Sequence, residues 1–414
     1  MIGDEPGSVR PIVDFSIGRV YRGPGTRRED AAQALSREEA CMIGSGSDVL
    51  RVGIVGCGLA TQSLHVPALQ SLAGSYRITA VTDASATVVA AVAARTGARA
   101  VADVFRLVED PEVDVVVMCT PDAFHLDHAL AACEARRRAV LVEKPMTLNA
   151  RMGRLLAEAA ARTSVPVLVD YPHVYDYATQ RVREVWGAAG NVTSGEFHCF
   201  LGNNDDYIGD VIQMIRPAGP PEPWVGMTAQ LDVATAATEV LGIAADVNSV
   251  VGYGIVLGLT IHDIPVLRRF AGDGLSVAHA RFRPGPNPLD IAGFGVDAVL
   301  ETASGTLILQ SEFSPLKRTD WGFRIRRPDL QAEAHFPTTF APAAPSRCSL
   351  WGAEAGATLE QRYTDFYETG FRRVWRHLYD VVVHGAAPET PARDAVRDLE
   401  LVEAIAAVAN KRRV

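Results

Sequence analysis

The sequence predicts a doubly wound α/β domain with a parallel sheet, followed by a second domain of the α+β class. The chain has 414 residues, more than one hydrophobic core usually supports, so two domains are expected. From residue 49 to residue 172, short Val-rich segments alternate with amphipathic ones, a pattern typical of a parallel sheet covered on both faces. From residue 173 to 414 the apolar segments are longer and separated by turn signals, which indicates a sheet of another kind.

Hydrophobic periodicity places the elements of the first domain. The expected strands cover residues 50–55, 78–82, 113–119, 139–142 and 165–169. The expected helices cover residues 64–72, 87–96, 125–134 and 151–162.

The second domain is expected to combine strands with two closing helices. The expected strands cover residues 195–200, 275–283, 293–302 and 306–313, and the expected helices 363–383 and 393–410. Four prolines predict an irregular loop between the first two of these strands, namely Pro217, Pro220, Pro221 and Pro223.

Residues 1–48 form an N-terminal extension whose sequence pattern differs from that of the rest of the chain. Residues 13–17 alternate like a short strand, Ser36 and Glu39 have the spacing of a capping box, and residues 44–47 are typical of a flexible joint. A mobile arm and a segment packed on a neighbour are both compatible with this pattern.

Composition narrows the classes of partner. The 40 basic and 49 acidic residues give a formal charge of −9, which disfavours nucleic acid and anionic membranes. No window approaches 18 uncharged apolar residues, so no membrane span is expected. The start of the chain lacks the pattern of a signal peptide, and the cysteines lack a CxxC pair, so we expect a cytoplasmic protein with reduced thiols and no metal. The six cysteines are Cys41, Cys57, Cys119, Cys133, Cys199 and Cys348.

The strongest local motif is a Gly-x-Gly turn between a strand and a helix. Gly56 permits the tight turn, Gly58 admits a pyrophosphate, and the N–H groups of the helix that begins at Leu59 and Ala60 face its charge. Thr61 stands where a third glycine is usual. Asp83 ends the next strand and is placed to accept a hydrogen bond from a ribose 2′-hydroxyl. This arrangement predicts a Rossmann fold that binds NAD, with NADP disfavoured by the carboxylate.

A second motif, Glu143-Lys144-Pro145, lies at the carboxyl end of an expected strand. Ligands of open α/β sheets bind at that edge, so Lys144 is expected at the chemistry. An ammonium there can bind a substrate hydroxyl and stabilise a developing alkoxide.

Together with residues 117–125 and 56–67, the Glu143-Lys144-Pro145 motif resembles the glucose–fructose oxidoreductase/inositol dehydrogenase (Gfo/Idh/MocA) family. The resemblance runs from about residue 50 to the C-terminus; it is specific over residues 50–175 and loose beyond them. It implies that Lys144 lies beside the nicotinamide, that Thr120 and Pro121 contact the cofactor with His125 after them, and that Glu143 belongs to the same site. It also implies a large, mostly antiparallel open sheet in the second domain, homo-oligomers built through its open face, and C-terminal helices that return to the first domain.

The same resemblance assigns His262, followed by Asp263, as the general acid/base, a role that suits an imidazole near neutral pH. This chain departs from the family at Gly258, where inositol dehydrogenases carry an aspartate, and at Pro265. Residues 172–175 also differ from the family pattern, and His173, Tyr175 and Asp176 are candidate replacement contacts.

The charge of residues 203–210 points to a substrate class. This stretch holds three carboxylates, including Asp205 and Asp206, and no Lys or Arg, which favours a cationic amino-sugar or aminoglycoside. A nucleotide-linked sugar would instead need a cation, for which Arg216 is the nearest candidate.

The sequence therefore predicts an NAD-dependent oxidoreductase acting on a secondary CH–OH of a sugar, amino-sugar/aminoglycoside or cyclitol derivative. The expected catalytic pair is Lys144 and His262. Reduction of a keto-sugar, possibly nucleotide-linked, and a non-catalytic NAD-binding regulator of the same fold remain alternatives. His125 and His128 have the spacing of metal ligands, but no third ligand accompanies them, so no metal is expected.

Overall fold

The computed structural model describes residues 49–203, 208, 212–217, 223–242, 246–286, 291–338, 344–354, 356–365 and 368–411. Residues 48–414 form one compact unit. The expectations for the N-terminal extension, for Pro220 and Pro221, and for Asp205 and Asp206 therefore lie outside the described residues.

The first sheet contains six parallel strands in the order β3-β2-β1-β4-β5-β6. The strands are β1 (Leu50–Val55), β2 (Tyr76–Thr82), β3 (Arg99–Ala100), β4 (Val115–Met118), β5 (Ala139–Glu143) and β6 (Val167–Asp170). The five expected strands form, and the two-residue β3 joins them. The strand order reverses at β1, so the turns after β1 and β4 open at the switch point where ligands of this architecture bind.

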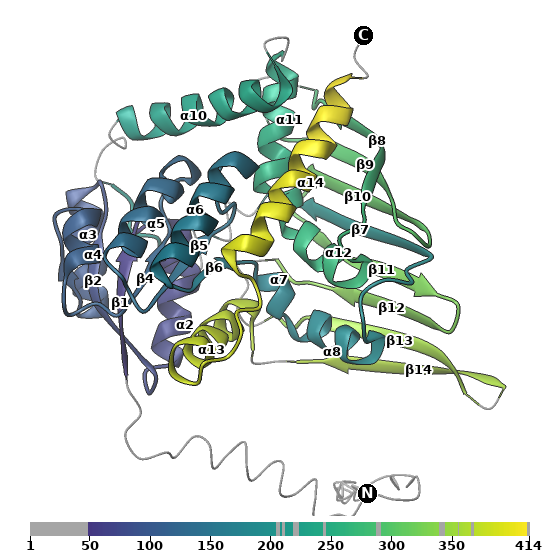
Figure 1. Ribbon diagram of the computed structural model, residues 1–414, viewed down its shortest axis with the longest axis horizontal. Coiled ribbons are helices and arrows are strands. Elements are labelled where there is room, and N and C mark those ends of the chain that lie inside the picture. Colours follow the sequence, from purple (N-terminus) through teal and green to yellow (C-terminus); the bar gives the residue numbers. More distant parts are fainter. Residues whose placement is uncertain are drawn as a thin grey trace, which may run out of the picture. The chain divides into compact units, whose positions relative to one another are not determined.

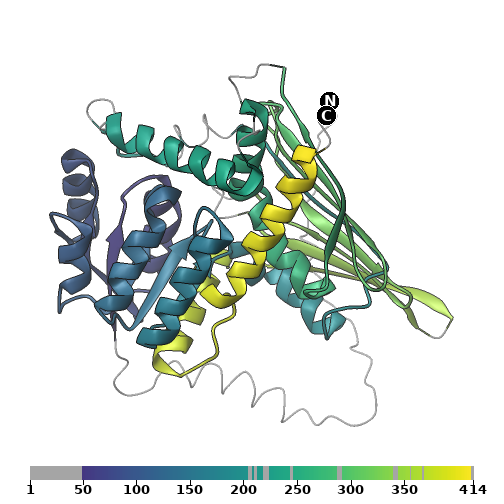
Figure 2. The same ribbon diagram turned by 45° about the horizontal axis from the view of Figure 1, so that its top comes forward.

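Helices cover this sheet on two faces, with α5 and α6 on one side and α2 and α13 on the other (Figures 1 and 2). These strands are buried almost throughout, as their Val-rich composition predicts. The helices of this part are η1 (Thr61–His65), α2 (Val66–Ser71), α3 (Ala86–Thr96), α4 (Val104–Glu109), η2 (Asp122–Phe124), α5 (His125–Glu134) and α6 (Ala150–Thr163).

The second sheet has eight strands in the order β14-β13-β12-β11-β7-β10-β9-β8. Its pairs are antiparallel except β7 with β10, which confirms a mostly antiparallel sheet. The strands are β7 (Ser194–Leu201), β8 (Ser276–Arg283), β9 (Gly295–Glu301), β10 (Thr306–Phe313), β11 (Asp320–Arg327), β12 (Leu330–His335), β13 (Arg347–Glu354) and β14 (Ala357–Thr364). The last four were not expected from the sequence.

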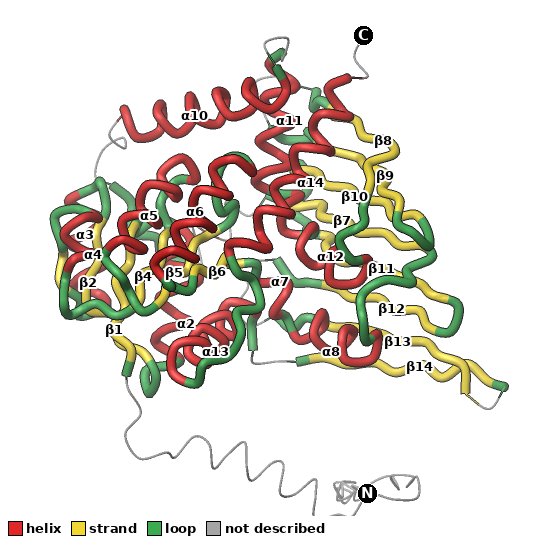
Figure 3. Tube along the Cα trace, viewed as in Figure 1, coloured by secondary structure: helices red, strands yellow, loops and turns green. Residues whose placement is uncertain are grey.

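Helices α8, α11 and α14 lie on the face of the second sheet that is turned toward the first, whereas α13 packs on the first sheet (Figures 1 and 3). The long helix α14 runs between the two sheets and packs on α6, α11 and β8. Within the described residues, the opposite face carries no helix (Figure 2). The helices are α7 (Pro172–Tyr175), α8 (Tyr177–Trp186), α10 (Pro223–Leu241), α11 (Val247–Gly258), η3 (Thr260–His262), α12 (Ile264–Ala271), α13 (Gly370–Val383) and α14 (Ala392–Lys411).

Two boundaries expected from the sequence are wrong. Tyr363 was expected to begin a helix but belongs to β14; the helix begins at Gly370, where the Thr369 side chain accepts a hydrogen bond from Arg372 N. Pro223 was expected in a loop and instead begins α10. A proline is well accommodated there, because the first helical turn leaves its N–H without an intrahelical partner.

No single described helix is long and apolar enough to cross a membrane. The segment Val247–His262 meets that test only when joined to Ile264–Ala271, from which it is bent by 56°. The five cysteines in the described part of the chain are free thiols.

Candidate active site

The turn after β1 is shaped by its two glycines. Gly56 has φ +89°, and a Cβ there would lie 2.5 Å from the carbonyl oxygen of Cys119, so only glycine fits. At Gly58 a Cβ would meet nothing within 4 Å, so the space above the turn is open. A large group can therefore approach this backbone closely, as a pyrophosphate does in dinucleotide sites.

The helix that follows the turn presents its N-terminus to the same space. Residues 59–71 are helical, Ala60 precedes the π-helical segment η1, and no side chain caps it. The Thr61 hydroxyl donates to the carbonyl of Gly56 at 2.5 Å, so this departure from a third glycine ties the turn to the helix. Uncapped N–H groups and the helix dipole make this end suitable for an anion.

Asp83 closes the turn from the end of β2. Its two carboxylate oxygens accept hydrogen bonds from Cys57 N at 2.7 Å and from Ser85 N at 2.8 Å. The carboxylate borders a cleft of about 1430 Å³, whose lining contains no Lys or Arg among the described residues. The lining is Val55, Gly56, Gly58, Thr82, Asp83, Ala84, Ser85, Ala102, Asp103, Val104, Cys119, Thr120, Pro121, Phe124, His128 and Pro217.

A second pocket of about 950 Å³ joins the first along Cys119 and Thr120, which line both. It brings Lys144 and His262 together with predicted cofactor residues of the first domain. Its lining is Leu59, Ala60, Leu64, Cys119, Thr120, Asp122, His125, Glu143, Lys144, Pro172, Leu201, Gly258, Leu259, His262, Phe313, Trp321 and Phe371. Arg216 is exposed and lies outside this lining.

Lys144 reaches across to the second domain. Its Nζ donates to the carbonyl oxygen of Gly258 at 2.9 Å, at the C-terminal end of α11. The free carbonyls at that end carry a partial negative charge that favours a cation. The carbonyl of Gly258 therefore holds the ammonium at the position where inositol dehydrogenases carry an aspartate. A Cβ on Gly258 would meet nothing within 4 Å, so space remains beside this residue.

The backbone of Lys144 is held by Glu143 and His65. Glu143 accepts hydrogen bonds from Lys144 N at 3.1 Å and from His65 Nε2 at 3.0 Å. The indole of Trp375 donates to His65 Nδ1 at 3.2 Å, which leaves the proton of a neutral His65 on Nε2. Burial opposes the charge on Glu143, yet the hydrogen bond from His65 and the nearby positive charges hold its pKa below the usual value.

His125 joins the two turns that border the pocket. Its Nδ1 lies 2.8 Å from the carbonyl oxygen of Pro145, and its Nε2 lies 2.8 Å from that of Thr120. The ring is fully buried and starts α5. It therefore fixes the position of Lys144 relative to the Thr120 turn, with no ring nitrogen left for a ligand.

One buried trio has the donor types of a metal site. Ligand atoms of His65, Glu143 and Asp170 lie within 4.8 Å of one another. Metal binding would need a lone pair on His65 Nε2, and the contact from Trp375 places a proton there. Burial and the charge of Glu143 raise the pKa of Asp170 well above its usual value, which favours a neutral carboxyl. The trio therefore supports Lys144, and Asp170 and Trp375 were not expected from the sequence.

His262 ends η3 and faces the pocket from the second domain. Its Nδ1 is buried with no hydrogen-bond partner in the described part of the chain, which leaves Nε2 as the nitrogen toward the pocket. Burial, the charge of Lys144 and His173 together lower its pKa well below the usual 6.5. A neutral imidazole at physiological pH suits a general base.

The candidate substrate residues in the described chain do not line the pocket that holds Lys144 and His262. Asp263 Oδ1 accepts from Trp321 Nε1 at 2.8 Å, and burial raises the pKa of Asp263 to about 7. The Tyr175 hydroxyl is bonded to Thr390 at 2.8 Å. Asp176 is bonded to His173, so these side chains lie behind the pocket wall.

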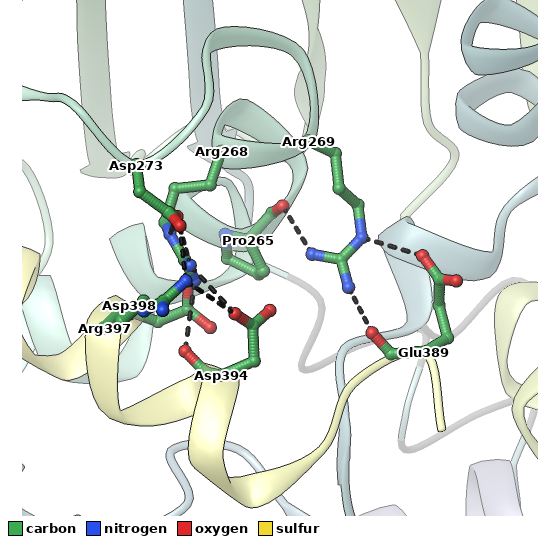
Figure 4. A network of polar contacts seen from close by, with 8 residues as sticks. All are labelled: Pro265, Arg268, Arg269, Asp273, Glu389, Asp394, Arg397 and Asp398. Atoms are coloured by element: carbon green, nitrogen blue, oxygen red, sulfur yellow. Dashed lines mark hydrogen bonds and ion pairs between the residues drawn. The ribbon is translucent and has the colours of Figure 1, made fainter. Parts of the chain in front are cut away.

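The segment that carries His262 is fixed by two arginines of α12 (Figure 4). Arg268 donates to Asp398 at 2.6 Å and to the Asp394 carboxylate at 3.0 Å, both on α14. Arg269 donates to the carbonyl of Pro265 at 2.9 Å and to Glu389 at 3.0 Å. These contacts tie the helix after His262 to the C-terminal part of the chain.

Residues 50–171 match the profile of an oxidoreductase family with an NAD-binding Rossmann fold, GFO_IDH_MocA. This match covers the glycine turn, Asp83, Thr120 and Lys144. Residues 50–171 are therefore similar to the Rossmann domain of the Gfo/Idh/MocA family. The resemblance inferred from the motifs is thereby confirmed.

Curated relatives match the same part of the chain. Inositol 2-dehydrogenase 2 of Saccharopolyspora erythraea is 35% identical over 120 residues, 29% of this chain. A scyllo-inositol 2-dehydrogenase (NADP(+)) of Bacillus subtilis is 30% identical over 137 residues, 31% of this chain. In both cases the match spans 35% of the relative's length.

The likeness in fold extends over both halves. A 3-ketoreductase from Actinomadura kijaniata, solved with NADP and TDP-benzene, superposes with a TM-score of 0.64. It covers 87% of this chain and 98% of its own at 18% identity. This confirms the two-sheet architecture.

Proposed function

We propose that this protein is an NAD-dependent oxidoreductase acting on a secondary CH–OH group of a sugar, amino-sugar/aminoglycoside or cyclitol derivative. The observation that carries the proposal is the pocket that joins Lys144 and His262 to Thr120, beside the glycine turn and Asp83. The names of the inositol dehydrogenases that match the first domain support the substrate class.

The glycine turn fits a dinucleotide by its own geometry. The open space at Gly58 and the uncapped helix start would receive the pyrophosphate, and Asp83 keeps lone pairs for ribose hydroxyls. When bound, the nicotinamide supplies the hydride acceptor for oxidation.

Lys144 and His262 would act on the substrate hydroxyl. The Lys144 ammonium donates a hydrogen bond and stabilises negative charge as it develops on oxygen. His262 takes the hydroxyl proton on Nε2, for which its lowered pKa keeps the ring neutral. The bond from Lys144 to Gly258 holds the ammonium at the pocket wall before substrate binds.

Asp83 supports NAD over NADP, because its carboxylate would repel a 2′-phosphate and no described Lys or Arg lines the cleft to bind one. The Bacillus subtilis relative is named for NADP(+), and the Actinomadura structure contains NADP, so these two names favour NADP against the preference inferred from Asp83.

Reduction of a keto-sugar is the second candidate, favoured by the fold likeness to a 3-ketoreductase bound to a TDP compound. The same residues would serve in reverse. A nucleotide-linked substrate would need cations for its phosphates, and Lys144 alone supplies one in the described lining of the pocket. This composition supports a substrate without a diphosphate.

The test is incubation of the full chain with NAD or NADP and a panel of polyols, cyclitols, aminoglycosides and nucleotide sugars, followed by absorbance of the reduced cofactor. The proposal expects NAD reduction with a polyol, cyclitol or aminoglycoside. Turnover of nucleotide sugars alone, or activity only with keto-sugars and reduced cofactor, would replace it with the second candidate. Cofactor binding without turnover in either direction would indicate a non-catalytic regulator.

A further inference from the structure

Two neighbouring histidines each hold one buried ring nitrogen without a partner. These nitrogens are Nδ1 of His262 and Nε2 of His173, unpartnered among the described residues. The two ring centroids are 5.9 Å apart, and the rings are inclined by 61°. A buried polar atom without a hydrogen bond costs roughly 1–3 kcal/mol, so two on adjacent rings call for an explanation.

The far side of His173 is firmly held. Its Nδ1 donates to Asp176 Oδ2 at 2.7 Å, while Gly370 N donates to Asp176 Oδ1 at 3.0 Å. With Nδ1 protonated in this bond, the Nε2 of a neutral His173 carries a lone pair and can only accept.

We infer that His173 and Asp176 form a positioning pair that sets the tautomer of His262, leaving Nε2 of His262 as the free base. The inference rests on the proposed function and deepens it. His262 Nδ1–H is the donor that His173 Nε2 lacks, and a small rotation of a ring or one water molecule would join the two. In either case hydrogen bonds are donated in the same direction, from His262 to His173 and from His173 to Asp176.

His262, His173 and Asp176, called the row below, act together during the reaction. As the substrate C–H bond gives its hydrogen and electron pair to the nicotinamide cofactor, the O–H bond breaks and its proton forms a new bond to His262 Nε2. The C–O bond becomes a carbonyl, and His262 becomes an imidazolium. His173 Nε2 then accepts from Nδ1–H of that cation, and the Asp176 carboxylate stabilises the row, as the third group does in acid–base triads.

Two other charged groups lie close to the row, and their effects on the rings must be distinguished from the effect of Asp176. Lys144 lies beside His262, and its charge opposes protonation of that ring. Asp263 lies near His173, with Oδ1 taken by Trp321 and Oδ2 unpartnered in the described chain. Asp263 is therefore the competing acceptor for a ring proton.

The direct test reads the tautomer in the full chain without substrate. Nitrogen-15 NMR of labelled imidazoles distinguishes a protonated from an unprotonated ring nitrogen, and the His262→Gln variant identifies the His262 signals. We expect Nδ1–H with an unprotonated Nε2 at neutral pH. The opposite tautomer would overturn the inference without touching the proposed function.

Variants locate the acceptor. His173 packs against Trp321 and Phe336 with ring centroids 4.3 Å away, so His173→Phe keeps an aromatic ring there and removes both nitrogens. We expect a mixed His262 tautomer and a kcat lowered roughly tenfold or more with little change in KM, as part of the about 10²- to 10⁴-fold that a positioned base contributes. A native tautomer in His173→Phe, with its loss in Asp263→Asn, would assign the acceptor to Asp263 and refute the pair.

The matched control is His198→Phe. His198 lies 3.3 Å from Asp320 in another His–Asp pair of the same domain and does not line the pocket. It should keep the native His262 tautomer and kcat. An equal loss of kcat in this control would show that the effect of His173→Phe is structural and would count against the inference.

Discussion

Two pairs of histidines in this molecule use their ring nitrogens differently. His65 and His125, in the cofactor half, have all four ring nitrogens engaged, by Glu143, Trp375 and two backbone carbonyls. His262 and His173, in the substrate half, each keep a buried nitrogen without a partner in the described chain. Ring nitrogens that are hydrogen-bonded fix the positions of the groups around them, whereas a ring nitrogen without a described partner can accept or donate a proton. The comparison separates residues that build the site from residues proposed to react in it.

Substitution of Lys144 is expected to have the largest effect on turnover. His65 and His125 support this lysine, and it lines the same pocket as His262. Lys144→Ala should retain cofactor binding and lower turnover by roughly 10² or more, because one donor to a developing oxyanion is worth about that much. Steady-state kinetics with NAD, alongside NADH fluorescence titration, measures both quantities. Near-native turnover would remove Lys144 from the chemistry.

The next effect concerns stability. His125→Phe fills a similar volume but removes the ring that contacts the buried carbonyls of Pro145 and Thr120, to one of which a neutral imidazole donates. A buried carbonyl left without its donor costs roughly 1–3 kcal/mol, so the free energy of unfolding should fall by about that much in urea titrations. A variant as stable as the native protein would show that the engaged pair is not structural.

Cofactor choice should respond to Asp83. Asp83→Asn retains an oxygen for one of the two backbone N–H groups and removes the charge that would repel a 2′-phosphate. Like charges about 4 Å apart cost on the order of 1–4 kcal/mol, so the preference for NAD should narrow by roughly tenfold. Competitive titration of both cofactors checks this, and tighter NADP binding by the native protein would overturn the assignment.

The smallest effect is a pH dependence of stability due to Asp263. Burial raises the pKa of Asp263 to about 7 in the folded chain, above its value of 3.8 when unfolded. The folded state therefore holds this proton better, and the resulting stabilisation is lost as pH rises through about 7. Urea midpoints should fall for the native chain as the pH rises from about 4 to about 7 and level off above that, with a smaller fall for Asp263→Asn. Equal slopes would contradict the assignment.

The first sheet was predictable because its signals are local. Buried Val-rich strands and one-turn motifs identify β1, β4 and β5 without knowledge of the rest of the chain. Strands β11 to β14 were missed even though β12 alternates between buried and half-buried residues. The Thr369 cap would have corrected the start of α13, because a threonine before a helix commonly accepts from its first turn.

The candidate site was predictable only as a set of residues. Sequence motifs selected Lys144 and His262 separately, and the pocket brings them together. No sequence pattern could pair His65 with Trp375 or Lys144 with the carbonyl of Gly258, since these contacts join residues 310 and 114 positions apart. His173 and Asp176 were expected as substrate contacts, but only the fold reveals their bond to each other.

The distinction between structural and catalytic histidines is tested most directly by measuring both the stability and the turnover of His262→Phe. The substitution removes a nitrogen whose one proposed link is to His173, so the free energy of unfolding should fall by no more than about 1 kcal/mol, the net value of a single hydrogen bond. Turnover should fall by roughly 10² or more, with NADH binding unchanged. Retained turnover, or a loss of stability comparable to that of His125→Phe, would contradict the account.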